Sequence, residues 1–469
     1  MYALAKQLIV EKDLQRKITI LENLISHPIL TTGELAKRVG VSQRTIFNDL
    51  QDLRLELPEE WLIEADGNTG VYLKAKKATR ISDVWEFYMK ESLTMQVLKQ
   101  LLVRQTIRLT DFLAKYGVSA ATLKRQIKKM NQVLKPFQLK IEQTSTDIYW
   151  VGEETAIRIF YHRLLLPFTY DHFFFEEHVV NKENYLFFLR RLERSKRQVD
   201  TEIDFGVCWF FINTVRIKSN CKIEQVVHVE DALFVVYQEE IRKLYLSEGI
   251  SLKEDELFFA FFCFLESWNF SLPKSVKQLV KTEYQFRFSE VKQFLMNVTQ
   301  DERLANDEQL IEECVLFLIK YYESASLADK FLLEYAEVLS ITRTYYRQLV
   351  EKVSLVIDAG YLLGEDSVSE AMINSLVLLI QTAKMKKQLE QVSCYFIYQG
   401  EPLWKHFLIQ ELRDLVGSRV VLVEKTSAEL KDSNLIPGDF ILSNVSLPLD
   451  EFDEQIPIFL FLLCHLIKN

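Results

Sequence analysis

The chain has 469 residues, of which 48% are hydrophobic and 26% are charged. This length exceeds what one hydrophobic core supports, and this balance excludes a disordered chain, so we expect three to five folded domains. The six cysteines lack metal-ligand spacing, and every apolar run is far shorter than the ~20 residues that cross a bilayer. The charged N-terminus is unlike a signal peptide. We therefore expect a cytoplasmic protein with reduced thiols and no metal, cofactor or membrane partner.

The net charge of −9 is divided unevenly along the chain. Residues 1–151 contain 23 Lys and Arg against 17 Asp and Glu, whereas the remainder contains 34 against 49. Although the whole chain is acidic, its N-terminal third is basic, which favours nucleic acid as the partner of this third.

The N-terminal third contains a repeat with a fixed offset of 77 residues. Glu34–Leu57 aligns without gaps with Asp111–Leu134, and Gly40-Val41-Ser42 falls on Gly117-Val118-Ser119. A Gly-Val-Ser turn followed by a basic and polar helix is typical of a helix-turn-helix, and two copies suggest a DNA-binding protein.

The first copy has the order of a winged helix-turn-helix. Gln15–Ser26 has the 3–4 apolar spacing of an amphipathic helix, and Thr31 and Thr32 offer caps for a short helix to Val39. Gly40 permits a tight turn, and Ser42 caps the next helix. Leu62–Ala65 and Val71–Ala75 predict a β-hairpin, the wing.

The second copy repeats these elements, with Leu139–Glu142 and Ile148–Val151 as its wing. We expect the winged helix-turn-helix domains to span residues 1–80 and 81–160.

The residues that point away from the buried apolar stripes determine what each copy can bind. Amide and guanidinium groups pair with base edges, whereas lysines suit phosphate contacts. The predicted DNA-binding residues are Gln43, Arg44, Phe47, Asn48 and Gln51 in the first recognition helix, Lys124, Arg125, Lys128 and Lys129 in the second, and the wing lysines Lys74, Lys76 and Lys77. In the alternative interpretation, the winged helices are protein-interaction modules and the charges only a solvated surface.

From about residue 155 to residue 389 the periodicity is helical, and we expect two all-helical domains over 161–286 and 287–390. Ser340–Tyr346 resembles the start of a recognition helix, but it lacks the turn glycine and a wing, and its Tyr and Leu residues fit a bundle interior. We therefore expect no third DNA-binding unit here.

Of these two helical domains, only the first contains histidines. A histidine on a regulatory bundle can accept a phosphoryl group, whose charge of about −2 rearranges a domain interface. The candidates are His172, His178 and His228, with His162 at the entry to the bundle. The alternative is that these are ordinary surface or capping histidines.

The last segment, 391–469, predicts a small α/β domain with a parallel sheet. Ser393–Tyr398, Arg419–Val423 and Asp439–Ser443 read as strands and Leu403–Val416 as a helix. The loop after the first strand has one glycine, no lysine and no cysteine nucleophile, so we expect no catalysis there. The apolar tail from Ile456 is either a buried final element or a self-association surface.

In this order of parts the chain resembles the Mga/AtxA-type transcriptional regulators of Gram-positive bacteria, most specifically in the doubled winged helix at 17–75 and 94–151. The resemblance implies two helical domains like those regulated by the phosphoenolpyruvate-sugar phosphotransferase system (PRDs) and an EIIB-like domain at 391–469 that forms a homodimer. It also implies phosphoacceptor histidines in the PRDs, for which His172, His178 and His228 are the candidates; the second PRD-like region has none. Cys394 lies inside a strand, so the phosphoacceptor cysteine of the EIIB transport enzymes is missing.

The expected function is therefore that of a dimeric regulator, an activator of virulence or carbohydrate-response genes, that binds double-stranded DNA and has no enzymatic activity. Phosphotransferase-system proteins are further expected partners. The competing hypotheses are an adaptor that senses phosphotransferase state without binding DNA and an antiterminator that binds RNA, although the latter would carry a small β domain at its N-terminus.

Overall fold

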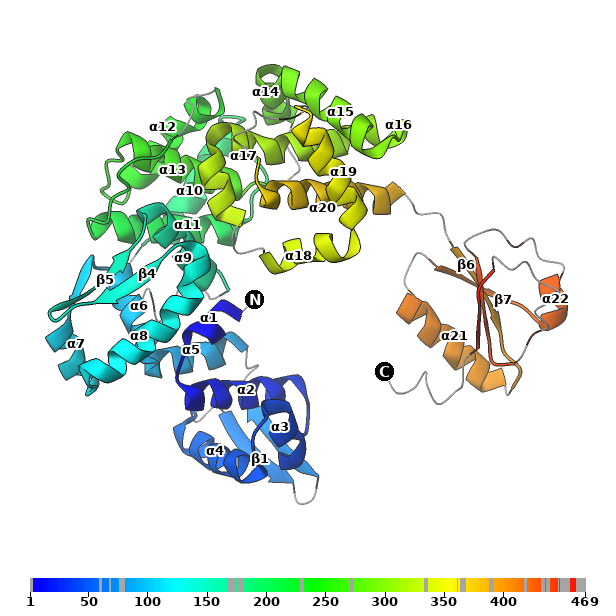
Figure 1. Cartoon of the computed structure of the whole chain (residues 1–469), viewed down its shortest axis with the longest axis horizontal. Coiled ribbons are helices and arrows are strands. Elements are labelled where there is room, and N and C mark those ends of the chain that lie inside the picture. Colours follow the sequence, from blue (N-terminus) through cyan, green and yellow to red (C-terminus); the bar gives the residue numbers. More distant parts are fainter. Residues whose placement is uncertain are drawn as a thin grey trace. The chain divides into compact units, whose positions relative to one another are not determined.

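The computed structural model divides the chain into two compact units, Met1–Val377 and Leu378–Asn469, and each is described by itself (Figure 1). The structure describes residues 3–58, 61–66, 69–75, 81–167, 174, 180–227, 232–269, 274–332, 336–360, 362, 368–387, 392–400, 402–416, 420–431, 435, 439–445, 447 and 456–460.

The first copy of the repeat is built from four helices and a hairpin: α1 Ala3–Leu8, α2 Lys12–Ser26, α3 Thr32–Val39, α4 Gln43–Glu56, β1 Trp61–Asp66 and β2 Gly70–Ala75. α3 begins with a capping box, in which the Thr31 side chain accepts from the Glu34 N–H and the Glu34 carboxylate accepts from the Thr31 N–H. α4 begins at Ser42, whose hydroxyl accepts from the Thr45 N–H at 3.2 Å.

The second copy has the same order of elements: α5 Ile81–Glu91, α6 Leu93–Leu102, β3 Thr106–Arg108, α7 Leu109–Tyr116, α8 Ala120–Leu134, the 3₁₀ turn η1 Lys135–Phe137, β4 Lys140–Gln143 and β5 Asp147–Val151. Its sheet has the order β3-β5-β4, with both pairs antiparallel. The two predicted helix-turn-helix units and their hairpins are therefore confirmed. α1, α5 and β3 were not predicted from the sequence.

The repeat extends to details of the backbone. Gly40 and Gly117 both adopt the left-handed conformation that a tight turn requires, with φ of 75° and 63°. Leu30 bridges Val71 in the first copy, and Ile107 pairs with Ile148 in the second, so the same residues of the repeat close both sheets. The shared pattern in the sequence thus corresponds to a shared backbone.

The two copies are packed against each other. Leu8 and Ile9 of the first copy and Met95 and Leu98 of the second lie in one continuous hydrophobic core. The Glu11 carboxylate accepts from the Leu93 N–H at 2.9 Å and from the Ser92 hydroxyl at 3.0 Å, at the start of α6. A carboxylate there satisfies free N–H groups of a helix end, so one copy caps a helix of the other.

The remainder of the first unit is helical, as predicted, and consists of α9 Glu154–Leu165, α10 Lys182–Arg194, α11 Ile203–Lys218, α12 Ala232–Leu246, α13 Glu254–Glu266, α14 Lys274–Glu283, α15 Gln285–Thr299, α16 Glu302–Ala305, α17 Glu308–Leu332, α18 Ala336–Tyr345, α19 Arg347–Asp358 and the start of α20 Glu370–Lys387, up to Val377. α11 and α13 are buried along almost their whole length, which explains their run of large aromatic side chains.

The segment that resembles a recognition helix forms the end of α18, and one expectation about it was wrong. Tyr345 is 74% exposed and Ile341 is 44% exposed, so this Tyr does not enter the bundle interior. Thr342 is the residue that faces inwards, and its hydroxyl bonds to Asn374. Among the described side chains of this segment, a threonine and not the exposed Tyr345 therefore lies on the buried face.

A buried charge network joins the second copy to the helical region. Arg158 of α9 donates two hydrogen bonds to the Glu256 carboxylate of α13, at 2.6 and 2.8 Å. Glu154, one turn before Arg158, accepts from Arg158 at 3.0 Å and from Arg216 at 2.8 and 2.6 Å. Arg216 also donates to the Leu101 carbonyl at the end of α6, so the network reaches the helix that Glu11 caps.

The second unit contains an all-parallel sheet in the order β7-β6-β8-β9, as predicted for an α/β domain. Its elements are β6 Val392–Ile397, α21 Pro402–Val416, β7 Val420–Glu424, α22 Ser427–Lys431, β8 Phe440–Ser443 and β9 Ile458–Leu460. β9 shows that the apolar tail begins as a strand of this sheet; its residues from 461 onwards lie outside the described part of the chain.

Replacing Arg158 with Ala should destabilise the first unit strongly. The change would leave the Glu256 carboxylate, 5% exposed, without its bidentate partner, and the loss of one member of a buried ion pair costs about 3–5 kcal/mol. Urea unfolding measured by circular dichroism tests this. As a control, Arg347→Ala removes an ion pair with Glu351 whose arginine is 82% exposed and should change stability by about 0.5 kcal/mol or less. Equal effects of the two variants would contradict a structural role for the network.

Candidate nucleic-acid interface

The first recognition helix, α4, exposes all five residues predicted to bind DNA on it. Gln43, Arg44, Asn48 and Gln51 are exposed, and the Phe47 ring is 53% exposed. The inward stripe consists of Ile46, Leu50 and Leu53, as the spacing predicts. One residue of the exposed face was missed: Leu55 is 86% exposed and lies four positions after Gln51. The same helical spacing would have found it.

The acidic residues of α4 are neutralised from α2. Asp49 is buried and accepts two hydrogen bonds from Arg16, one of them at 2.7 Å from Nη2. Lys17 lies 2.5 Å from the Glu56 carboxylate and 3.8 Å from the Asp52 carboxylate. These pairs offset negative charge that would repel phosphate, and the Arg16–Asp49 pair fixes α4 on α2.

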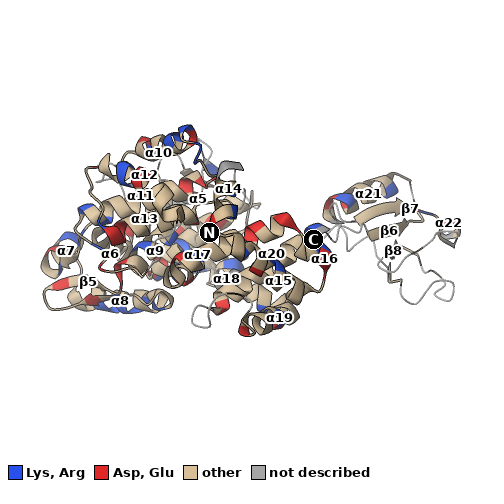
Figure 2. Cartoon of the chain, turned by 90° about the horizontal axis from the view of Figure 1, so that it is seen from above, with Lys and Arg blue, Asp and Glu red and all other residues tan. Residues whose placement is uncertain are grey.

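The second recognition helix, α8, carries an uncompensated basic face. Lys124, Arg125, Lys128 and Lys129 are all exposed, and none has a carboxylate partner among the described residues. Figure 2 shows the Lys and Arg positions along α8 in blue. Gln126 points partly inwards and has a side-chain oxygen without a hydrogen-bond partner in the described structure. The face therefore suits phosphate more than base edges.

The wing cations are partly neutralised by their own hairpins. Lys74 is 61% exposed and lies 3.3 Å from Glu64. Hydrogen bonds from Tyr72 and then Lys74 lower the pKa of Glu64. The second wing repeats this arrangement, since Glu142 accepts from Lys140 and from Tyr149. The predicted contacts Lys76 and Lys77 lie outside the described residues.

The candidate phosphoacceptors His172, His178 and His228 also lie outside the described residues. His162 is buried, stacked on Trp209 with ring centroids 4.1 Å apart, and its Nε2 contacts the Phe205 carbonyl at 3.1 Å. Burial, with a contribution from Arg163, lowers the pKa of His162 well below its usual value. His162 is therefore a neutral ring of the core, inaccessible to a phosphoryl donor.

Cys394 is buried within β6, and burial raises the pKa of its thiol to about 11. In the loop that follows, Asn444 accepts from the Gln399 N–H and donates to the Gln399 carbonyl. This loop is thus held by a side-chain amide, and the thiol lies inside the sheet as the sequence predicts. Among the described residues, no cluster of three His, Cys, Asp or Glu could hold a metal, and no helix is both long and apolar enough to cross a membrane.

Three family models match the chain. Residues 11–68 match the M protein trans-acting positive regulator (MGA) helix-turn-helix domain, and residues 77–165 match the Mga helix-turn-helix domain. These matches fall on the two copies of the repeat. Residues 283–386 match a non-canonical single-stranded DNA-binding domain. That region holds ten Lys and Arg against 17 Asp and Glu, so its charge opposes phosphate binding even where the fold is similar.

Similar proteins come from Bacillus anthracis and include two that match over nearly the whole chain. The capsule synthesis positive regulator AcpB is 22% identical over 94% of both chains. The anthrax toxin expression trans-acting positive regulator is 21% identical over 96% of this chain and 95% of its own. The capsule synthesis positive regulator AcpA is 28% identical over 38% of each chain. Both helix-turn-helix models thus fall on the two copies of the repeat, and the chain is similar over nearly its whole length to positive regulators of the Mga/AtxA type.

Proposed function

We propose that this protein is a homodimeric transcription activator of virulence or carbohydrate-response genes that binds double-stranded DNA through both copies of the repeat. The observation that carries the proposal is the pair of recognition helices: each exposes its polar or basic residues while its apolar stripe is buried. The capsule and toxin regulators that this chain resembles are named as positive regulators, which supports activation over repression.

The two recognition helices have different tasks. α4 presents Arg44 and Asn48, which can pair bidentately with guanine and adenine, and Phe47 can contact a thymine methyl group. α8 presents four cations that hold the sugar-phosphate backbone and add affinity without sequence information. A protein of this kind recognises few bases and depends on the shape and length of its site.

Regulation through the helical region extends this proposal. The two helical domains act as PRDs, with boundaries at 161–286 and 287–390, and phosphorylation of His172, His178 or His228 by phosphotransferase-system proteins tunes activity. An added charge of about −2 would disturb packing near a domain interface. These three are the candidates because His162, the histidine that the structure describes in that region, is buried.

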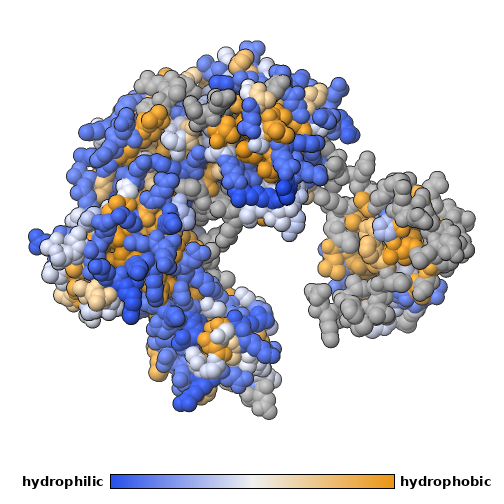
Figure 3. Space-filling model, in the orientation of Figure 1, coloured by the Kyte–Doolittle hydropathy of each residue, from blue (hydrophilic) through white to orange (hydrophobic). Residues whose placement is uncertain are grey.

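The C-terminal EIIB-like domain, 391–469, forms the dimer. Leu403 is 72% exposed, and Trp404 and Phe407 about half exposed, on the outer face of α21. Figure 3 shows hydrophobic residues over this part of the second unit. Exposed apolar residues that gather on one helix face are typical of an association surface.

Removal of the basic face should weaken DNA binding at all sequences alike. For Lys124→Ala/Arg125→Ala/Lys128→Ala, the slope of log affinity against log salt should become shallower by roughly 2–3, since each phosphate contact contributes about 0.9. Fluorescence anisotropy over a salt series measures this. Lys292→Ala/Lys352→Ala, exposed cations of the acidic region, is the control. An unchanged slope in the triple variant would make the second copy a protein-docking module.

Arg44→Ala and Asn48→Ala should instead reduce discrimination between sequences. Each should lower the preference for the selected site over random DNA by about 1–3 kcal/mol, the value of one bidentate base contact, and leave binding to random DNA nearly unchanged. Selection of sites from random fragments, followed by competition binding, gives both quantities. If instead these variants lost affinity for random and selected DNA equally, α4 would contact only the backbone.

Trp404→Asp/Phe407→Asp should dissociate the dimer, because the substitutions place charge on the proposed contact. The molar mass measured by light scattering during size-exclusion chromatography should fall from twice the chain mass of 55.2 kDa to the mass of one chain. Arg413→Ala, also exposed on α21 but away from these residues, should leave the dimer intact. A dimer that survives the double substitution would place the contact elsewhere.

A further inference from the structure

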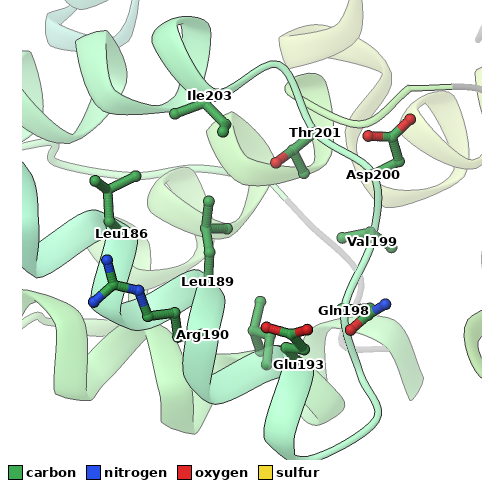
Figure 4. Close-up of a pocket in the computed structure, with 10 residues that line it drawn as sticks. Leu186, Leu189, Arg190, Glu193, Gln198, Val199, Asp200, Thr201 and Ile203 are labelled. Carbon is green, nitrogen blue, oxygen red and sulfur yellow. The ribbon is translucent and has the colours of Figure 1, made fainter.

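A cavity of about 570 Å³ lies in the helical region, and no residue of either recognition helix lines it (Figure 4). One wall is α10, from Leu186 to Glu193, and the other is the extended segment from Gln198 to Ile203 that leads into α11. No part of the function proposed above uses this cavity.

The extended wall has a free backbone edge. Thr201 forms a single antiparallel bridge with Trp268. The hydrogen bonds of this bridge flank the pair: the Glu202 N–H donates to the Ser267 carbonyl at 2.9 Å, and the Asn269 N–H donates to the Asp200 carbonyl at 2.8 Å. In such a pair the N–H and C=O of Thr201 itself point away from Trp268. Neither has a hydrogen-bond partner within the described structure.

The cavity runs along this edge. Successive side chains of an extended segment point to opposite faces, so a cavity over one face would be lined by alternate residues only. Here four consecutive residues, 198 to 201, line it. The Thr201 hydroxyl points toward α10 in Figure 4. The space is therefore bordered by unpaired backbone groups as well as by side chains.

The interior of the cavity is aliphatic. Leu186, Leu189 and Leu192 contribute from α10, and Val199 and Ile203 from the opposite wall. Ile203 is 45% exposed, an unusual state for an isoleucine at the start of a well-buried helix. A hydrophobic side chain that entered here would remove this surface from water.

The rim of the cavity carries surplus negative charge. Glu193 and Asp200 stand on opposite walls, and neither has a cationic partner among the described residues. Arg190, the cation of the rim, lies 3.8 Å from Glu183. Two unpaired carboxylates beside an aliphatic interior attract a ligand that is both apolar and basic.

We propose that this groove binds an extended segment of a partner protein, which adds as a strand to the edge at Thr201. Backbone hydrogen bonds to Thr201 supply affinity, an aliphatic side chain enters the cavity, and a Lys or Arg pairs with Glu193 and Asp200. This is strand addition, in which main-chain bonds bind and alternate side chains select. The proposal is independent of DNA binding.

Selection of random 12-residue peptides displayed on phage, with the intact full-length chain as bait, tests this groove. The selected peptides should alternate aliphatic residues and contain Lys or Arg. Their binding should fall at least tenfold in Thr201→Pro, which removes the free N–H, and stay within about twofold in the matched variant Thr201→Val, which keeps it. Glu193→Gln/Asp200→Asn should weaken binding three- to tenfold.

Circular dichroism melting and DNA binding of each variant establish that the fold is intact, since the internal bonds at Glu202 and Asn269 do not use the Thr201 N–H. N-methylation of the peptide amide that faces Thr201 should abolish binding in wild type. Peptides that bind Thr201→Pro as well as wild type would overturn strand addition. Recovery of no specific peptide, or competition by a simple alkylamine alone, would overturn the peptide ligand.

Discussion

The contact between Glu11 and the first turn of α6 fixes how the protein presents its two helix-turn-helix copies. The carboxylate satisfies the Leu93 N–H, and the Thr94 hydroxyl donates to the Leu8 carbonyl at 2.7 Å in return. Both bonds cross between the copies and are covered by the hydrophobic core they share. The copies therefore form one folded body, and the separation of α4 and α8 is set by protein packing and not by a linker.

Buried ion pairs join the two helix-turn-helix copies to the helical region, and breaking such a pair destabilises the fold. Arg216 donates to a carbonyl at the end of α6 and to Glu154 of α9. Arg158 of α9 donates to Glu154 and to Glu256 of α13. Lys330 of α17 adds an ion pair to Glu153. A change in helical packing thus has a continuous path of polar contacts as far as α6, which packs against the second recognition helix in the shared hydrophobic core. Coupling through such a path requires two arrangements of these groups, and the phosphorylation proposed above would act by selecting one of them.

Periodicity and the repeat predicted both helix-turn-helix copies, because apolar spacing, the turn glycines and the serine caps are all local signals. The exposed residues of α4 and α8 followed from the same stripes. The Glu11 cap and the Arg158–Glu256 pair were not predicted, since their partners are 82 and 98 residues apart. Tyr345 was misplaced because aromatic content suggests burial, whereas the described side chain of this segment that faces inwards is Thr342, bonded to Asn374. The free backbone edge at Thr201 could not be predicted, because it depends on backbone pairing with Trp268 and not on residue type.

The central claim is that α4 and α8 bind DNA as one body with fixed spacing. It is tested by inserting base pairs between the two contacted segments of a selected and footprinted site. We expect insertion of about 5 base pairs, half a helical turn, or of about 10, a full turn, to reduce affinity to that of one copy alone. Insertion of a full turn returns the second contacted segment to the same face of the DNA but moves it further away. Because the copies cannot separate, this insertion should not restore affinity. Full affinity after either insertion would show that the copies move independently and would contradict the account.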